Sequence, residues 1–438
     1  MRDLTAARFL LRRTPLEAAS LPPSVSRRIS EVFGEDLTAG AAVDLIIDSV
    51  RTGGDAALLT LADKIDGISL THLEVSKDEI SQARKRVSGD LVNALKLAAK
   101  RVRSFHHKQK RHAATSFSSA GLGQVVRPLE RVGIYVPGGT SSYPSTVLMT
   151  AIPARVAGVQ DIVMCTPPNK EGAVPAITLA AADIAGVDRV FMVGGAQAIA
   201  AMAFGTTTIP KVDKICGPGN IFVTLAKKKV YGTVDIDGLQ GPTETVVVAD
   251  ETANPALCAA DLLAQAEHDP MSSAILITCS DAVAEAVSSE VDRQLALLER
   301  NRIASESISK NGAIIVTETV DQALELANLY APEHLCLLLK DAASHVPKVR
   351  NAGGIFVGEV SPEALGDYVA GPSHVMPTSG TARFSSPLGV HHFLKVSSLV
   401  ALTEADLKAL GPSAAALARA EGLTAHARAV EQRLERLL

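Results

Sequence analysis

A short polar run, Gln265-Ala266-Glu267-His268, ends a stretch of sequence with the apolar spacing of a helix. Residues three apart on a helix lie on one face, so Gln265 and His268 could present an amide oxygen and an imidazole nitrogen together. Such a pair binds a divalent metal ion only if other side chains complete the shell. Asp367 and His426 are downstream candidates, although alone Asp367 fits a turn and His426 an exposed helix position.

A second candidate is the adjacent pair Glu333-His334, which follows Ala331-Pro332. A carboxylate beside an imidazole supplies two groups that titrate near neutral pH, and such a pair suits successive proton transfers. The competing interpretation is an ordinary polar loop after a helix.

Three glycine-containing turns follow apolar runs, at 135–139, 193–197 and 217–220. Each would offer free backbone N–H groups at the start of a helix, which suits a phosphate or a carboxylate. None spells the dinucleotide fingerprint G-x-G-x-x-G, and the triphosphate-binding pattern is absent from the sequence. Singly, each turn is simply a tight turn; at the strand ends of one sheet, the three would line one crevice.

The elements that must position these residues alternate along the chain. Short apolar runs predict strands, and the Ala-rich stretches between them predict helices. The strands are expected at 132–136, 161–166, 189–193, 245–249, 274–278, 313–316 and 354–357. The helices are expected at 173–185, 196–203, 221–230, 255–266 and 320–329, besides helical sequence between 31 and 115. Continuous apolar strands between helices indicate an α/β fold with parallel sheets covered on both faces.

The composition excludes several classes of protein. The 438 residues are 47% hydrophobic with a formal net charge of −4, so wholesale disorder and a nucleic-acid-binding role are disfavoured. The short basic run Lys227–Lys229 is interpreted as a helix end. The five cysteines include no C-x-x-C pair, and Cys216 beside a glycine turn is interpreted as a buried apolar residue rather than a catalytic thiol. Without a membrane span or targeting segment, we expect a cytoplasmic protein.

Taken together, these segments resemble histidinol dehydrogenase, a zinc enzyme family of histidine biosynthesis, over essentially the whole chain. The matching segments are 105–110, 133–139, 193–198, 217–220, 241–244, 261–268, 331–335, 366–368 and 421–426. Their number and order make a chance similarity very improbable.

The resemblance implies a role for each matching residue. The expected zinc ligands are Gln265, His268, Asp367 and His426, with one Zn²⁺ per subunit. The expected catalytic acid/base pair is Glu333 and His334, and the expected NAD contacts are Tyr135, Gln197 and Asn220. The expected contacts to the substrate, L-histidinol, are Thr243, Gln265, His268, His334, Asp367, Glu421 and His426. Thr243 departs from the serine that the family often has, but it keeps the hydroxyl group.

The resemblance also implies an architecture: two Rossmann-like parallel-sheet domains without the usual glycine-rich fingerprint, plus small helical terminal segments, in an intertwined homodimer. We expect a helical arm at 1–30, a discontinuous α/β domain at 31–130 plus 242–385, and an NAD-binding α/β domain at 131–241. A helical segment at 386–438, with apolar residues such as Leu434 and Leu437, would reach the partner subunit's site.

Two rival functions are compatible with part of this pattern. A related zinc dehydrogenase could act on another small alcohol, such as a sulfonated diol, although the full ligand set with Glu421 favours the amino alcohol. A non-catalytic ligand-binding or regulatory protein could keep the same scaffold, although intact Glu333-His334 disfavours it.

Overall fold

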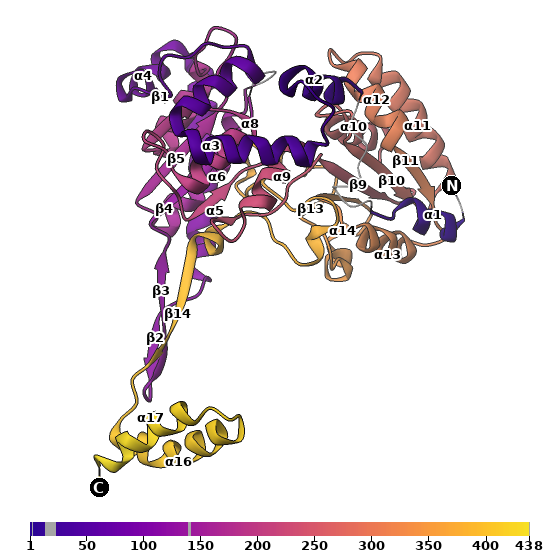
Figure 1. Cartoon of the computed structure of the whole chain (residues 1–438). Coiled ribbons are helices and arrows are strands. Elements are labelled where there is room, and N and C mark those ends of the chain that lie inside the picture. Colours follow the sequence, from indigo (N-terminus) through magenta and orange to yellow (C-terminus); the bar gives the residue numbers. More distant parts are fainter. Residues whose placement is uncertain (2, 14–22, 139–141, 438) are drawn as a thin grey trace. The chain divides into compact units, whose positions relative to one another are not determined.

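The computed structural model describes residues 1, 3–13, 23–138 and 142–437, except for the side chains of residues 23 and 24. By its contacts the chain forms two units, here called the body and the tail. The body comprises residues 1–111 and 129–393, and the tail comprises residues 112–128 and 394–438. The body contains two sheets, each flanked by helices (Figure 1).

The first sheet of the body has six strands in the order β1-β6-β5-β4-β7-β8. These are β1 (Glu74–Val75), β4 (Arg131–Tyr135), β5 (Asp161–Thr166), β6 (Arg189–Met192), β7 (Lys214–Cys216) and β8 (Asp235–Ile236). All pairs are parallel except β1 with β6. From β4 the chain steps through β5 to β6 on one side and then returns to β7 on the other. This is the strand order of a Rossmann half, with its switch point between β4 and β7.

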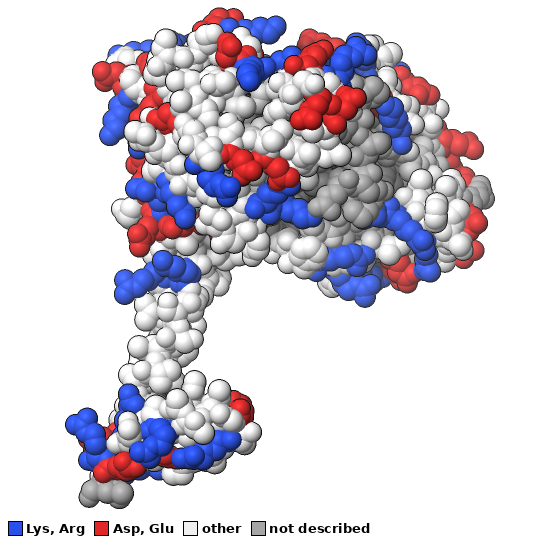
Figure 2. Space-filling view, in the orientation of Figure 1, with Lys and Arg blue, Asp and Glu red and all other residues white. Residues whose placement is uncertain are grey.

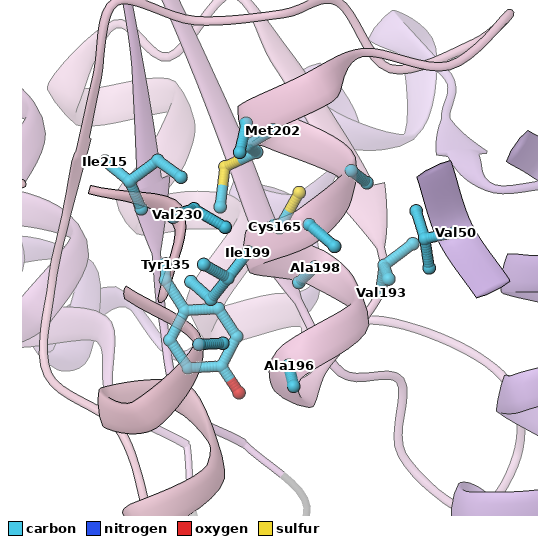
Figure 3. Packing of buried hydrophobic residues seen from close by; sticks show 14 of the residues in the cluster. Val50, Tyr135, Cys165, Val193, Ala196, Ala198, Ile199, Met202, Ile215 and Val230 are labelled. Carbon is cyan, nitrogen blue, oxygen red and sulfur yellow. The ribbon is translucent and has the colours of Figure 1, made fainter. Parts of the chain in front are cut away.

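Helices cover the six-stranded sheet. The helix α3 (Ala39–Leu61) packs with α8 (Gly195–Phe204) and α9 (Ile221–Val230) around one cluster of buried apolar residues (Figure 3). The helix α6 (Pro144–Ala157) contacts β4 and β5 and packs against α5 (Gly89–Arg111) and α7 (Ala176–Ala185). A Cβ at Gly133 of β4 would lie 2.5 Å from the sulfur of Met202, so glycine lets α8 approach the sheet.

The second sheet has five parallel strands in the order β11-β10-β9-β12-β13. These are β9 (Glu244–Ala249), β10 (Ser273–Thr278), β11 (Ala313–Val316), β12 (His334–Leu338) and β13 (Gly354–Val357). The order again reverses, here between β9 and β12. Alternate residues face opposite sides of a strand, and both faces of this sheet are buried under apolar side chains.

Different helices cover the two faces of the five-stranded sheet. The helices α10 (Pro255–Ala266) and α11 (Asp281–Leu295) bury the face with Val247 and Ala249, and α12 (Asn301–Asn311) packs beside them. The helix α13 (Val320–Tyr330) buries the opposite face, with Val246 and Val248, together with α1 (Leu4–Leu10).

The tail has a sheet and a helix pair of its own. The antiparallel strands β2 (Phe117–Ser119), β3 (Leu122–Pro128) and β14 (Leu394–Val400) form the sheet, in the order β14-β3-β2. The helices α16 (Glu404–Ala420) and α17 (Thr424–Glu435) pack together. The side chains on this sheet are mostly uncharged on the face that Figure 2 shows.

The remaining elements are short. They are α2 (Pro23–Phe33), α4 (Lys77–Gln82), α14 (Ala342–His345) and α15 (Glu363–Leu365); the 3₁₀ helices Ala83–Arg86, Val346–Lys348, Thr381–Arg383 and Val390–Phe393; and the π-helices Ala62–Asp66 and Gly366–Ala370.

The predicted mixed α/β fold with parallel sheets is confirmed. All seven predicted strands form, and β5, β11 and β13 have the predicted bounds. The sequence did not predict β7, β12 or the sheet of the tail. No helix among the described residues is long and apolar enough to span a membrane.

Candidate active site

The pair Glu333-His334 lies at the amino edge of the five-stranded sheet. The strands β9 and β12 start side by side, with His334 opposite Thr245, so Thr243 and Glu244 come beside the pair. The interpretation of 330–335 as a polar loop is wrong for His334, which begins a buried strand. Ligands of doubly wound sheets usually bind at the carboxyl edge, whereas this pair lies at the amino edge of its sheet.

Glu333 is buried and holds its carboxyl group against two neighbours. Its Oε2 lies 2.6 Å from the hydroxyl oxygen of Thr243 and accepts from the backbone N–H of Glu244 at 3.2 Å. Burial raises the pKa of Glu333 to about 8, against the opposing charge of His334. The Thr243 hydroxyl also lies 2.8 Å from Oε1 of Gln265. Since one hydroxyl donates one proton, Thr243 can donate to Glu333 or to Gln265, but not to both at once.

His334 is buried between two acceptors. Its Nδ1 is 3.2 Å from the carbonyl oxygen of Glu244, and its Nε2 is 3.2 Å from Oδ1 of Asp367. Burial alone would lower the pKa of the imidazole, but the carboxylates of Glu363, Glu333 and Asp367 outweigh burial and raise it to about 10. The ring stacks on Phe356, with 5.6 Å between the ring centroids. Its plane is therefore fixed by contacts on its edges and on one face.

Glu363 fixes the amide of Gln265, and the sequence did not single it out. Glu363 is completely buried, and its Oε2 accepts from Nε2 of Gln265 at 2.7 Å. Its Oε1 accepts from the hydroxyl of Thr245 and, at 2.9 Å, from the thiol of Cys336. Burial raises the pKa of Glu363, and the three donated hydrogen bonds oppose that rise. The Gln265 amide is thus oriented with its oxygen toward Thr243.

The body holds three of the four expected metal ligands. Gln265 ends α10, His268 follows it, and Asp367 lies on the π-helix Gly366–Ala370 rather than in the expected loop. Asp367 interacts electrostatically with His268 as well as with His334. Among the described residues no group of three His, Cys, Asp or Glu side chains is placed to hold a metal ion. The expected ligand set differs from such a group in including the amide oxygen of Gln265.

His426 and Glu421 belong to the tail. Glu421 caps the end of α16, and His426 lies in the first turn of α17. Both side chains are exposed. The assignment of both residues to the site stays a prediction.

The three glycine-containing turns come together at the carboxyl edge of the six-stranded sheet. Tyr135 ends β4, and its hydroxyl accepts from the backbone N–H of Gly195 at 3.1 Å. In Figure 3 this hydroxyl points away from the buried apolar side chains, toward the start of α8. Gly217 after β7 has φ +117°, and a Cβ there would lie 2.1 Å from the Tyr135 carbonyl oxygen, so only glycine fits.

The other two expected cofactor contacts lie on these same turns. Gln197 is buried in the first turn of α8. Asn220 is exposed and is the N-cap of α9, where its side chain accepts from the backbone N–H groups of Phe222 and Val223. Tyr135, Gln197 and Asn220 therefore border one edge of one sheet, at its switch point.

A buried ion pair supports the turn between β7 and α9. The Lys227 ammonium contacts Oδ1 of Asp237 and donates to the carbonyl of Gly217 at 3.0 Å and to Oε1 of Gln240 at 2.7 Å. Asp237 Oδ2 accepts from the N–H of Gly217 at 2.7 Å. The run 227–229 forms the last turn of α9, as the helix-end interpretation predicted, but Lys227 is only 1% exposed and belongs to this buried ion pair. Cys216 before this turn is fully buried, and burial raises the pKa of its thiol, as expected for an apolar role.

Contacts of His374 connect the carboxyl edge of the six-stranded sheet with the segment that carries Asp367. Thr146, in the first turn of α6 after β4, places its hydroxyl oxygen 3.2 Å from Nε2 of His374. The Nδ1–H of His374 donates to the carbonyl oxygen of Asp367 at 2.8 Å. The segment that carries Asp367 therefore touches the helix that starts at the carboxyl edge of the six-stranded sheet.

Known proteins resemble this chain in sequence and in fold. The model of the family described as histidinol dehydrogenase matches residues 34–434. The chain is 54% identical to the histidinol dehydrogenase of Dehalococcoides mccartyi (strain CBDB1) over 90% of each chain. It is 52% identical to that of Deinococcus radiodurans over 98% of each. A crystal structure of histidinol dehydrogenase from Elizabethkingia anophelis superposes with a TM-score of 0.88 at 36% identity, covering 99% of this chain and 97% of that one. The chain belongs to the histidinol dehydrogenase family of oxidoreductases.

Proposed function

We propose that this chain oxidises L-histidinol to L-histidine through L-histidinal in the last steps of histidine biosynthesis, with Zn²⁺ and two molecules of NAD. The observation that carries the proposal is the hydrogen-bonded cluster of Glu333, His334, Thr243, Gln265 and Asp367 at one sheet edge. It combines two proton-transfer groups with oxygen donors for a cation.

The chemistry of the donors fits a zinc ion. Gln265 offers an amide oxygen, His268 an imidazole and Asp367 a carboxylate, and we propose His426 as the fourth ligand. The carboxylates around His334 also leave local negative charge that a divalent cation would offset. When bound, zinc would orient the substrate and polarise its alcohol oxygen.

His334 is the group that we propose as the base for the alcohol. Its Nδ1–H stays fixed on the carbonyl oxygen of Glu244. If Asp367 held a cation, the ring would lose part of the negative charge that raises its pKa, and Nε2 would be available to accept the alcohol proton. NAD, when bound, would supply the hydride acceptor. His334 would accept a proton again in the second oxidation.

Glu333 is the group that we propose for hydration of the aldehyde. Its carboxyl lies beside Thr243 in a buried setting, and burial raises its pKa to about 8. A carboxyl with a pKa near the working pH can accept a proton from water as it adds to the aldehyde. The buried walls around it would also shield the reactive aldehyde from bulk solvent.

NAD is proposed to bind at residues 131–241, on the turns that carry Tyr135, Gln197 and Asn220. The support is the position of these residues at the carboxyl edge of the sheet that holds the switch point, beside the N-termini of α8 and α9. The contacts of His374 with Thr146 and with the carbonyl oxygen of Asp367 connect these turns to the segment that carries Asp367.

The substrate contacts complete the proposal. Thr243, Gln265, His268, His334 and Asp367 are proposed to contact the substrate from the body. Glu421 and His426 are proposed to reach it from a second copy of the chain, with Glu421 pairing with the substrate ammonium. Exposed apolar residues in the tail support a homodimer: Phe117, Leu122, Val396, Val400, Leu402, Leu410, Leu417 and Leu423.

The test is NADH formation by the purified protein with L-histidinol and NAD, combined with product analysis. We expect two NADH per L-histidine, loss of turnover on chelation, and recovery with Zn²⁺. If the zinc-loaded protein turns over a different small alcohol but not histidinol, the substrate assignment is wrong. If no alcohol in a panel yields NADH, a non-catalytic role replaces the enzyme.

A further inference from the structure

We propose that Arg13, in the N-terminal segment, is a positioning residue for the Glu333–His334 pair and acts through Glu244. The N-terminal segment is defined here as the described residues 1 and 3–13, which lie outside the 34–434 span of the family match. The proposal rests on the proposed function, because it assumes that Glu333 and His334 do the chemistry.

Arg13 is held in one orientation by a carboxylate, a backbone carbonyl and an aromatic ring. Its Nη1 and Nη2 pair with the two carboxylate oxygens of Glu244, and the Nη2–Oε2 distance is 2.7 Å. Its Nε and Nη2 donate to the carbonyl oxygen of Tyr330 at 3.2 and 2.9 Å. The guanidinium carbon lies 3.5 Å from the centroid of the Tyr330 ring. A planar, bidentate and stacked guanidinium of this kind has no equivalent among other side chains.

Glu244 connects Arg13 to both catalytic side chains. The backbone N–H of Glu244 donates to Oε2 of Glu333 at 3.2 Å, and its carbonyl oxygen lies 3.2 Å from Nδ1 of His334. Its side chain is anchored by Arg13 and by the N–H of Ser379 at 3.0 Å. Arg13 therefore fixes Glu244, whose backbone N–H contacts Glu333 and whose backbone carbonyl contacts His334.

Arg13 also balances charge beside the pair. Glu244 is 5% exposed and adjoins the buried carboxyl of Glu333. Burial raises the pKa of Glu244, and the Arg13 guanidinium opposes that rise. Without Arg13, the Glu244 carboxylate would be buried beside the Glu333 carboxyl with no guanidinium paired to it. An unpaired buried charge disfavours a fixed position of the Glu244 side chain.

The segment has anchors that do not depend on Arg13. Ala7 and Leu11 are buried in the apolar cluster under α13. The N-terminal ammonium of Met1 donates to the carbonyl oxygen of Ile314 at 3.0 Å, and the N–H of Val316 donates to the carbonyl oxygen of Met1 at 2.8 Å. A change at Arg13 should therefore leave the segment docked on the five-stranded sheet.

The experiment compares Arg13→Met, Arg13→Lys and the double variant Arg13→Met/Glu244→Gln in the zinc-loaded full chain. Arg12→Met is the matched control, because Arg12 is exposed and its guanidinium lies over the exposed ring of Phe9. We measure kcat and KM for histidinol and NAD, together with bound zinc. Arg13→Met should lower kcat roughly 10- to 100-fold, the effect of a misplaced catalytic group, with zinc content and the KM for NAD unchanged.

Two further results bear on the route through Glu244. Arg13→Lys should recover part of the loss, because it keeps the charge but not the fork. The double variant should be more active than Arg13→Met, because it removes the unpaired carboxylate as well. Arg12→Met should match the wild type.

Wild-type kcat in Arg13→Met overturns the inference, and so does a loss of kcat that follows loss of zinc. If Arg13→Met does not fold, Arg13→Lys decides, because unchanged kcat there rules out a need for the bidentate fork. An unmodified protein that forms no NADH with histidinol refutes the proposed function instead, and so the two failures are distinguishable.

Discussion

Glu333 and His334 are adjacent in the sequence, but the structure holds them by different means. The Glu333 carboxyl lies against a hydroxyl and a backbone N–H, and its pKa is raised mainly by burial. The His334 ring has an acceptor at each nitrogen and an aromatic ring on its face. One group is thus suited to hold a proton near neutral pH, and the other to exchange a proton along a fixed direction.

At the residue scale, we expect Glu333→Gln to separate the two oxidations. Glutamine keeps the size of the side chain but cannot accept a proton from water, so aldehyde oxidation should fall by about 10²- to 10⁴-fold. Histidinol oxidation should be affected much less, because His334 serves that step. Single-turnover NADH formation, started separately from histidinol and from histidinal, measures both. A variant that loses zinc, or slows both oxidations equally, would contradict the assigned role.

The residues that the sequence missed are those whose roles depend on distant contacts. Arg13 and Glu244 are 231 residues apart in the chain, and no local pattern links them. Glu363 looks like any acidic residue at a helix start, yet it is fully buried and orients Gln265. Buried charges without a local partner cannot be recognised from periodicity, because their neighbours come from other elements.

At the element scale, the parallel strands were predictable because each is a continuous apolar run between helices. The strand β12 was not predicted, because it begins with His334 directly after the polar Glu333. The tail sheet was not predicted, because β3 and β14 pair although they are far apart in the sequence. Neither strand is buried enough to show a clear apolar pattern. The loop that bears Asp367 is a π-helix, a geometry that sequence patterns do not reveal and that often occurs at functional sites.

The turn between β7 and α9 gives a prediction at the element scale. Lys227→Met would leave Asp237 charged and buried, and breaking such a pair costs about 3–5 kcal/mol in the free energy of unfolding. Because Lys227 and Asp237 hold the two backbone groups of Gly217, the KM for NAD should rise as well. Urea unfolding and NAD titration of initial rates measure the two effects.

The matched control for this prediction lies on the same helix. Lys229 pairs with Asp44 at 2.6 Å, and both side chains are substantially exposed to solvent. Lys229→Met should therefore change the free energy of unfolding by less than about 1 kcal/mol and leave the KM for NAD unchanged. Equal losses in the two variants would show that the buried pair has no special role in shaping the turn.

At the scale of the whole molecule, the proposed site draws residues from both units of the chain. The body supplies Gln265, His268 and Asp367, whereas His426 and Glu421 are exposed on the tail. The tail also exposes large apolar side chains, including Leu417 and Val400, each 66% exposed. A second copy of the chain would cover this apolar surface and complete both sites by symmetry.

Subunit mixing tests this arrangement. His334→Asn inactivates the body's base, and His426→Asn removes the proposed ligand in the tail, so each variant alone should have little activity. In a mixed dimer with shared sites, one site would combine an unmodified body with an unmodified tail, whereas the other would carry both changes. Refolding the two variants together at equal concentration should therefore restore about a quarter of wild-type turnover, since about half of randomly paired dimers are mixed. If each site instead draws His426 from its own chain, mixing restores nothing, because every site then carries one of the two substitutions.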